Sequence, residues 1–194
     1  MIHPKEEITY MMIKPDGVRR GLTGEIIRRI EQRGLKIVAL RMIEPNREKV
    51  DNHYPKDEAW INRLGEKTTA TYEKFGYDLE KDMGTREKDK IGREVRGWLV
   101  DYMVSAPLVG LVIKGVHAVD MVRKLAGPTM PADAAPGTIR GDYSVDSAAL
   151  ANREKRSVFN LVHASETQEE AKHEIKHWFG EYKLLDYDRT DDAV

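Results

Sequence analysis

The chain has 194 residues, a length that suits one domain or one domain with a large insertion. Its net charge of −1 gives no overall attraction to nucleic acid or to an anionic membrane, and the lack of cysteine excludes disulfides, thiolate nucleophiles and cysteine-bound metals. Hydrophobic residues make up 40% of the chain, which is enough for a core. The first residues lack the apolar run of a signal peptide, and the longest apolar segment, 108–113, is far too short to span a bilayer. We therefore expect a cytoplasmic protein.

The first forty residues predict a β-α-β unit. An apolar, β-rich run at 8–13 predicts a strand, and an Asp16-Gly17 turn follows it. Thr23 is a candidate N-cap for a helix with isoleucines on one face, and Gly34 fits the C′ position at its end. Alternating residues at 35–40 predict a second strand.

A similar unit recurs later in the chain. The sequence predicts a strand at 108–113, a helix at 116–126, a closing strand at 158–162 and a last helix at about 166–179. Two such units predict an α/β (α+β) fold of the ferredoxin-like type, a split β-α-β sandwich with a four-stranded antiparallel sheet covered by helices. The alternative, a parallel doubly wound sheet, would need more strands than the sequence shows.

Two stretches lie outside this pattern. Residues 55–95 are highly charged and predict a solvated helical hairpin. Four residues there are candidates for a buried stripe: Trp60, Leu64, Tyr72 and Phe75. Residues 127–157 are rich in Gly, Pro, Ala and Asp and predict a long loop, which in a compact domain is usually functional or disordered.

One histidine stands out as a candidate nucleophile. His163 lies where the predicted closing strand meets the last helix, and the ordinary pKa of a histidine, about 6.5, leaves much of the imidazole neutral at pH 7. Glu174 lies on the following helix with its side chain directed back toward the helix start, so it is a candidate to orient His163. Either Ser165 or Thr167 fits a capping box at that start. We expect the helix's own histidines, 173 and 177, to be surface residues.

Three basic residues lie at positions where the sequence predicts a constrained backbone or a functional loop. Lys14 ends the first strand, where Pro15 fixes it in an extended conformation. Arg123 lies on the predicted helix before Gly127, and Arg140 lies in the glycine-flanked loop 136–142; guanidinium groups match phosphate oxygens in a bidentate fashion. The sequence lacks a P-loop, a dinucleotide fingerprint, a glycosidase carboxylate pair and a serine elbow. The remaining set of a histidine, a lysine and two arginines suits phosphoryl transfer.

The chain closely resembles the nucleoside diphosphate kinase family. Three segments, 13–18, 136–142 and 160–166, resemble the family's signature segments in order and context. Further matching residues are His53-Tyr54, Arg123, Thr129 and Trp178-Phe179. The resemblance covers nearly the whole chain except residues 55–94 and about 144–156. It is consistent with a single domain over 1–194, with insertions at about 55–95 and 144–156.

The resemblance implies transfer of the γ-phosphate of ATP to nucleoside diphosphates, by a ping-pong route through a phosphohistidine, in a protein that maintains nucleoside triphosphate pools. It implies a homo-oligomer, a hexamer or tetramer, with no need for nucleic acid or membrane. His163 would be the nucleophile, Glu174 its orienting partner, and Tyr54 a residue near the transferring phosphate. The implied phosphate ligands are Lys14, Arg123, Thr129 and Arg140, and the implied contacts to the sugar hydroxyls are Lys14 and Asn160. Mg²⁺ would be held mainly by the nucleotide phosphates rather than by protein ligands.

Three departures from the family pattern stand out. The family stacks the base on a phenylalanine after an Arg-Pro pair, but the matching stretch here, 92–97, offers Val95, with Phe75 or Tyr77 as alternatives. Ala164 replaces the glycine after the histidine, a small change that we expect to be tolerated. The loop after Arg140 is longer, and in the family this loop packs at subunit contacts, so the type of oligomer stays open.

Two other functional classes remain to be weighed. A non-catalytic nucleotide-binding protein with this fold would be expected to lack part of the residue set, whereas this chain retains all of it. A nucleic-acid-binding protein is disfavoured by the near-zero net charge and the few clustered aromatic residues. The base preference and the phosphorylated nitrogen of the imidazole are left open by the sequence.

Overall fold

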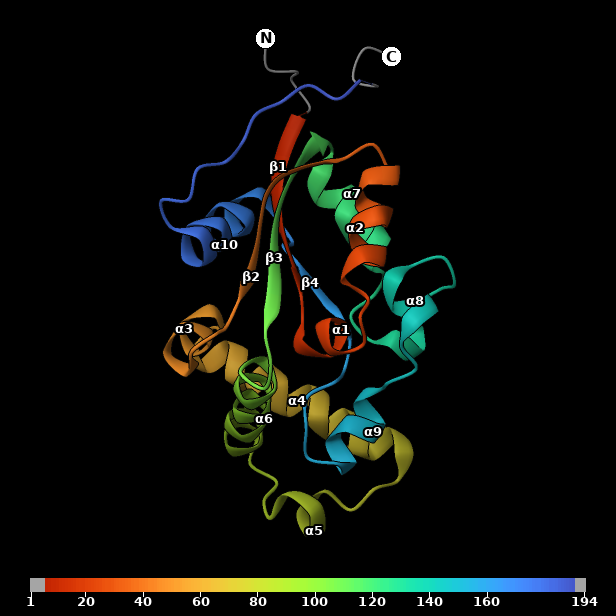
Figure 1. Cartoon of the computed structure of the whole chain (residues 1–194). Coiled ribbons are helices and arrows are strands. Elements are labelled where there is room, and N and C mark those ends of the chain that lie inside the picture. The colour runs from red at the N-terminus through yellow and green to blue at the C-terminus, as the bar shows by residue number, and fades with distance from the viewer. Residues whose placement is uncertain (1–5, 191–194) are drawn as a thin grey trace.

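A four-stranded antiparallel sheet is the centre of the molecule in the computed structural model, which describes residues 6–190 (Figure 1). The strands are β1 (Glu6–Ile13), β2 (Lys36–Ile43), β3 (Leu108–Val116) and β4 (Val162–Ala164), and their order in the sheet is β2-β3-β1-β4. All three pairings are antiparallel. The predicted ferredoxin-like fold is therefore confirmed.

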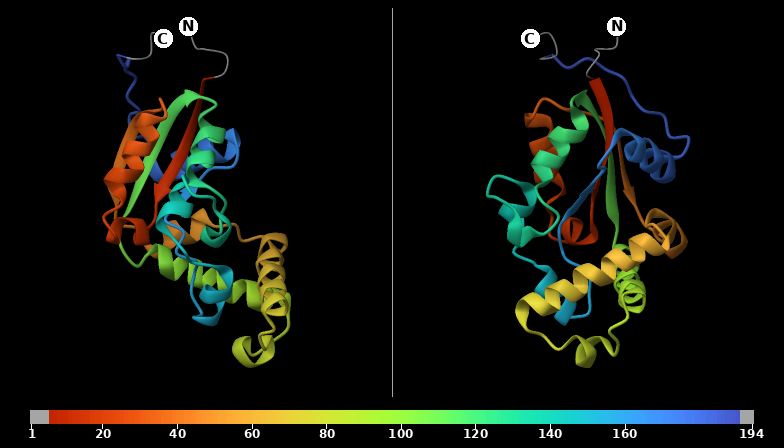
Figure 2. Two further views of the ribbon diagram at one scale, coloured as in Figure 1. Left: turned by 90° about the vertical axis from the view of Figure 1, so that its right-hand side faces the viewer. Right: turned by 180° about the vertical axis from the view of Figure 1, so that it is seen from behind.

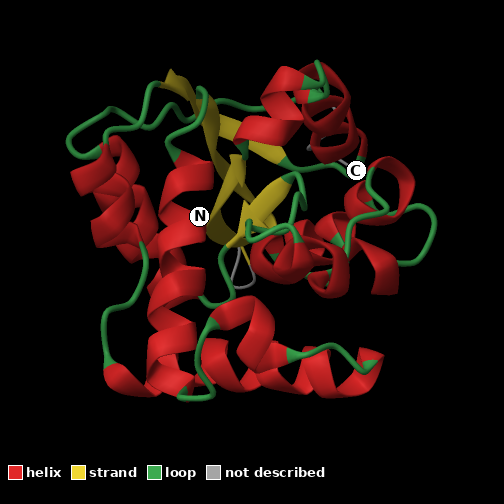
Figure 3. Cartoon of the chain, turned by 90° about the horizontal axis from the view of Figure 1, so that it is seen from below, coloured by secondary structure: helices red, strands yellow, loops and turns green. Residues whose placement is uncertain are grey.

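Helices cover both faces of the sheet, because successive side chains of a strand point to opposite sides. Met11 and Ile13 of β1 face one core, which α2 (Thr23–Gln32) and α7 (Ala118–Ala126) complete. Tyr10 and Met12 face a second core formed with α3 (Arg47–His53), α6 (Lys88–Met103) and α10 (Gln168–Phe179). Figure 2 shows α2 and α7 on one side of the strands and α10 on the other, with α6 beyond their end, and Figure 3 shows helices around the sheet seen from below. All four of these β1 side chains are fully buried.

The remaining helices are short or belong to the stretches outside the repeated unit. They are α1 (Pro15–Arg19), α4 (Glu58–Phe75), α5 (Leu79–Met83), the 3-10 helix η1 (Pro131–Asp133), α8 (Ile139–Tyr143) and α9 (Ala148–Arg153). The long loop predicted at 127–157 is thus wrong in part, because three short helices lie within it. Local caps hold two of them: the Thr138 hydroxyl accepts from the Gly141 N–H and the Ser147 hydroxyl from the Leu150 N–H.

Of the two predicted ends of α2, the C-terminal one is confirmed and the N-terminal one is wrong. Gly34 has a φ of +81°, and the Leu35 N–H donates to the Ile30 carbonyl while the Gly34 N–H donates to that of Glu31. This is the Schellman arrangement, and the predicted C′ role of Gly34 is confirmed. The prediction for Thr23 is wrong: Leu22 is the N-cap and no side chain caps the helix. The turn expected at Asp16-Gly17 is instead the start of α1, with Pro15 in its first turn.

The charged stretch 55–95 folds into helices that pack tightly on one another. Gly65 of α4 and Gly92 of α6 lie at the crossing, where an added Cβ would come within 1.9 Å of the Lys88 carbonyl oxygen and 2.0 Å of the Ile61 carbonyl oxygen, respectively. The helical hairpin is confirmed, but the predicted buried stripe is only partly right, since Tyr72 is buried and Trp60, Leu64 and Phe75 are not. The buried residues of α4 are Ile61, Gly65, Thr68 and Tyr72, whereas Phe75 is 48% exposed.

The closing strand differs most from its prediction. The apolar run 158–162 is not a strand; β4 begins only at Val162. The Val162 N–H donates to the Asn160 carbonyl at 2.7 Å across Leu161, which has a φ of +67°. This three-residue turn interrupts the run and directs the chain into the sheet at His163.

Substitution of the crossing glycines tests this packing. We expect Gly65→Ala and Gly92→Ala each to lower the free energy of unfolding by about 3 kcal/mol or more, because backbone atoms must move apart to admit the methyl group. Gly97→Ala in α6 is the matched control, since its Cβ would meet nothing within 4 Å, and it should stabilise by about 0.5–1 kcal/mol. Urea unfolding of the three variants measures the difference. Equal effects at all three sites would contradict the close crossing.

Candidate active site

The predicted functional residues converge on one open cavity of about 840 Å³. Those that line it are Lys14, Tyr54, Arg123, Thr129, Arg140, Asn160, His163 and Glu174. They come from the end of β1, the end of α3, α7, the segment around α8, β4 and α10. Residues far apart in the sequence therefore meet at one edge of the sheet.

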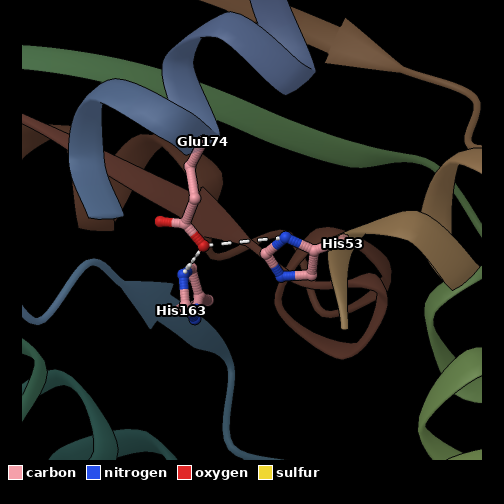
Figure 4. A group of neighbouring side chains, drawn as sticks. All are labelled: His53, His163 and Glu174. Carbon is pink, nitrogen blue, oxygen red and sulfur yellow. Dashed lines mark hydrogen bonds and ion pairs between the residues drawn. The ribbon is translucent and has the colours of Figure 1, made fainter. Parts of the chain in front are cut away.

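His163 and Glu174 form the centre of the site (Figure 4). The imidazole Nε2 lies 2.6 Å from Glu174 Oε1, and the Ser165 hydroxyl donates to Glu174 Oε2 at 2.5 Å. Glu174 is buried, with 4% of its side chain exposed, whereas the His163 side chain keeps 23% exposed. Because the carboxylate accepts the Nε2 proton, the neutral ring carries its lone pair on Nδ1. That nitrogen points away from Glu174 (Figure 4).

His53 is a neighbour of this pair that the sequence marked only as part of a matching dipeptide. Its Nδ1 lies 3.6 Å from Glu174 Oε1, and its ring stands perpendicular to that of His163 at 5.2 Å between centroids. The Trp178 indole N–H donates to the same Nδ1 at 3.3 Å. Burial and the nearby His163 hold the pKa of His53 well below its usual value, so His53 stays neutral. His53 therefore forms no ion pair with Glu174, whose Oε1 is hydrogen-bonded to His163.

Lys14 and Asn160 are fixed by the turn that precedes β4. The Lys14 ammonium donates to Asn160 Oδ1 at 2.7 Å, and its backbone N–H donates to the Leu161 carbonyl at 2.8 Å. The Asn160 amide donates in turn to the Thr129 carbonyl at 3.0 Å. Burial, together with the positive charge of Arg140, lowers the pKa of Lys14 to about 7. The backbone at Lys14 is extended, as the following proline predicts.

Arg140 uses three of its N–H groups to hold the backbone of the site. They donate to the carbonyl oxygens of Asn160 at 3.0 Å, Gly127 at 2.6 Å and Val162 at 2.6 Å. A guanidinium has five N–H donors, so two are left over. Burial and the neighbouring Arg123 lower the pKa of Arg140 to about 10, which leaves it charged at pH 7. Arg123 itself is 44% exposed and lies 3.5 Å from Glu166.

A wall of aromatic and basic side chains completes the cavity on the α4 side. Tyr54 and Trp60 lie 6.2 Å apart between ring centroids, and Pro55, Trp60 and Arg63 line the cavity. Burial and the charge of Glu174 raise the pKa of Tyr54 above its usual value, so its hydroxyl stays protonated. Arg96 of α6 fixes this segment by donating to the Asp51 carboxylate at 2.6 Å and to the Pro55 carbonyl at 3.1 Å.

Val95 is placed away from the cavity, which corrects its predicted role as a platform for the base. It packs in a third core with Tyr72, Met83 and Ile91, because α4 and α5 cover the amino-terminal half of α6. The two alternatives also fail, because Phe75 and Tyr77 stack on each other at 5.7 Å and do not line the cavity. Nothing in the sequence pattern of 92–97 signals this covering by a segment twenty residues away.

The last helix also differs in detail from its prediction. Of the two capping candidates, Thr167 is the N-cap and accepts from the Glu170 N–H, whereas Ser165 bonds to Glu174. His173 is exposed, as expected. His177 is half-buried and its Nε2 lies 2.9 Å from the Lys49 carbonyl, so the surface position predicted for it is wrong.

A histidine oriented by a carboxylate and surrounded by cations, on an antiparallel α/β sandwich, defines a phosphotransferase type of site. The family model for nucleoside diphosphate kinase matches residues 7–62 and 87–184. A nucleoside diphosphate kinase from Pyrobaculum aerophilum is 49% identical over 180 residues, which cover 93% of this chain and 98% of that protein. One from Archaeoglobus fulgidus is 37% identical over 186 residues, which cover 96% and 95%.

Comparison with solved structures gives the same result as comparison of the sequences. The crystal structure of an NDP kinase from Pyrobaculum aerophilum has a TM-score of 0.89 and 48% identity, and the match covers 93% of this chain and 100% of that one. A transition-state mimic of the nucleoside-diphosphate kinase from Borrelia burgdorferi, with bound vanadate and ADP, has a TM-score of 0.76 and 32% identity over 98% and 97%. The chain belongs to the nucleoside diphosphate kinase family.

Within residues 6–190, no helix has the length and apolar character needed to cross a bilayer.

The role of Arg140 in holding the backbone is testable apart from activity. We expect Arg140→Lys to lower the free energy of unfolding by about 2–4 kcal/mol, since an ammonium cannot reach three carbonyl oxygens in three directions and leaves buried acceptors unpaired. Arg123→Lys is the control, because Arg123 is exposed and its single ion pair is worth at most about 1 kcal/mol. Urea unfolding of both variants provides the measurement. A loss of stability at position 123 equal to that at position 140 would contradict the assignment.

Proposed function

We propose that this protein transfers the γ-phosphate of a nucleoside triphosphate such as ATP to nucleoside diphosphates, with His163 as the residue that carries the phosphate. The observation that supports this most is the His163–Glu174 hydrogen bond, which leaves Nδ1 unprotonated and available in a cavity lined by cations. Such an enzyme maintains the nucleoside triphosphate pools, and we propose that it does so in the cytoplasm.

The proposed reaction has two balanced steps. In the first, the Nδ1 lone pair attacks the γ-phosphorus in line, an N–P bond forms, and the bond from phosphorus to the β–γ bridging oxygen breaks, so that a nucleoside diphosphate leaves with its electrons. Nε2 keeps its proton, and Glu174 stabilises the positive charge on the ring. In the second step a different diphosphate binds the same cavity and its terminal oxygen attacks the phosphohistidine, which restores the neutral imidazole.

The surrounding residues are proposed to bind and orient the phosphates. The Lys14 ammonium, the two spare N–H groups of Arg140 and the exposed guanidinium of Arg123 offset the charge on the phosphoryl oxygens. The protonated Tyr54 hydroxyl and the exposed Thr129 hydroxyl are further donors. Asn160 and Lys14, joined by their hydrogen bond, are proposed to contact the sugar hydroxyls.

Mg²⁺ is the proposed cofactor, held mainly by the phosphate oxygens of the nucleotide. The side chains fit this arrangement better than a metal site built from protein ligands. The nearest candidate set, His53, His163 and Glu174, offers two ring nitrogens and a carboxylate that already binds His163 and Ser165. Mg²⁺ prefers oxygen ligands, and when bound it would neutralise part of the charge on the phosphates.

Trp60 is proposed as the platform for the base in place of Val95. Its ring lies beside Tyr54 at the cavity wall, and stacking on an indole needs no particular hydrogen-bonding edge.

We also propose that residues 1–194 form a single domain with insertions at about 55–95 and 144–156, and that the protein is a homo-oligomer, a hexamer or tetramer. The segment that the family model leaves unmatched, 63–86, falls inside the first of these insertions.

The phosphohistidine is directly testable. Incubation with γ-labelled ATP and no acceptor should label the wild-type protein with an acid-labile, alkali-stable phosphate, and His163→Gln should take up none. His173→Gln is the control, because this exposed histidine of α10 does not line the cavity. Addition of a diphosphate should then remove the label as the triphosphate. Label that persists in His163→Gln would exclude His163 as the acceptor.

The lowered pKa of Lys14 predicts how binding depends on pH. Above pH 7 a growing fraction of Lys14 is neutral, whereas bound phosphates favour the charged form, so a proton is taken up on binding. The Kd for ADP should therefore rise by up to about tenfold per pH unit between pH 7.5 and 9, a range in which the ADP phosphates keep a constant charge.

Titration calorimetry in buffers of different ionisation enthalpy measures both the affinity and the proton uptake. Lys14→Met should bind ADP weakly and without this slope. Lys124→Met, which removes an exposed lysine from the same cavity, should keep the slope. A slope that survives in Lys14→Met would show that another group takes up the proton.

A further inference from the structure

Helix α4 brings a basic side chain into the cavity from a segment outside the family model. The matched residues end at 62 and resume at 87, and Arg63 is the first residue beyond the match. It lines the cavity together with Trp60, three residues earlier on the same face of the helix. This chain therefore adds a cation to the site that the general family pattern does not specify.

Arg63 has no ion pair or hydrogen bond with any other residue in the part of the chain that the structure describes, and its side chain is exposed. The acidic residues that flank it on α4 are already engaged by α6. Glu58 binds Arg93 at 2.5 Å, and Glu66 binds Lys88 at 3.1 Å. The guanidinium is thus available to a ligand.

The amino-terminal half of α4 is held in place, so the position of Arg63 is defined. The Asp57 carboxylate caps the helix by accepting from the Trp60 N–H at 2.9 Å. Two residues beyond Arg63, Gly65 packs against the backbone of α6 at the close crossing. A side chain between a cap and a tight crossing is carried by a rigid backbone.

A series of aromatic rings relates Arg63 to the nucleophile. His163 contacts His53 at 5.2 Å, His53 contacts Tyr54 at 5.0 Å, and Tyr54 contacts Trp60 at 6.2 Å, all between centroids. Arg63 lies one turn beyond Trp60, about 4.5 Å further along the helix axis. A nucleotide with its terminal phosphate at His163 and its base on Trp60 therefore has its base in the part of the cavity that Trp60 and Arg63 line together.

We propose that Arg63 donates two hydrogen bonds to the O6 and N7 atoms of a guanine base, so that the enzyme prefers guanine nucleotides as substrates. Guanine presents two adjacent acceptors to a guanidinium, whereas adenine presents N7 beside an amino donor, and the pyrimidines present no such pair. This inference rests on the proposed function, since it takes the cavity to be the nucleotide site.

The test compares kcat/KM for GDP, IDP, ADP and CDP with ATP as the donor. IDP keeps O6 and N7 but lacks the 2-amino group, so GDP and IDP should both exceed ADP and CDP by about tenfold. In Arg63→Met the ratio of GDP to CDP should fall to nearly one. The control is Lys67→Met, which removes an exposed lysine one turn further along α4 that does not line the cavity, and it should keep the wild-type ratio. Trp60→Ala should lower kcat/KM for all four substrates.

A second probe isolates the contact to N7. In 7-deaza-GDP this acceptor is replaced by a C–H group, so its kcat/KM should be several-fold below that of GDP in the wild type and equal to it in Arg63→Met. Equal losses for all bases in Arg63→Met, or a wild type without preference for GDP and IDP, would overturn the role of Arg63 while phosphate transfer itself stands. If no diphosphate is turned over, the proposed function fails, and calorimetric binding of GDP, 7-deaza-GDP and CDP still decides whether Arg63 reads the base.

Discussion

The hydrogen bond between His163 Nε2 and Glu174 is the interaction on which the site depends. It selects one tautomer of the imidazole and so leaves Nδ1, rather than Nε2, unprotonated and unbound by Glu174. The carboxylate can do this because it is buried, accepts from Ser165, and is not shared with a charged His53. The sequence left the reacting nitrogen open, and three contacts that form only in the folded chain settle the tautomer.

The sheet and its covering helices were predictable because their signals are local. The two-residue alternation of β1 and the Gly34 cap of α2 act within a few residues, and both agree with the structure. Five of the proposed site residues were found from local patterns, and Tyr54, Thr129 and Asn160 only from the resemblance to the family; all eight line the cavity. The errors occur where contacts between distant parts of the chain determine the local structure. The run 158–162 reads as a strand, but Arg140 and Asp16 bind its backbone and hold it as a turn. Val95 is covered, and Trp60 lines the cavity, because α4 packs across α6.

The free protein holds two cations in an unfavourable environment. Burial lowers the pKa of both, aided by the charge of Arg140 at Lys14 and by that of Arg123 at Arg140, so part of the free energy of folding maintains a cavity that disfavours its own charges. Anionic phosphates remove this penalty on binding. The same arrangement explains why the cations are held by carbonyl and amide oxygens rather than by carboxylates, since an acidic partner would neutralise them and compete with the ligand.

The left-handed conformation of Leu161 has a consequence for the order of folding. A branched, fully buried residue with a φ of +67° costs about 1–3 kcal/mol relative to an ordinary conformation, so the isolated segment does not adopt it. The conformation becomes stable only after the Lys14 N–H, which follows β1, donates to the Leu161 carbonyl, Asp16 of α1 accepts from the Leu161 N–H, and Arg140 of α8 binds the Val162 carbonyl. The segment that leads into His163 therefore cannot take its native conformation before these contacts form, and chains that have formed their helices but not yet docked α8 against the sheet have no assembled candidate site.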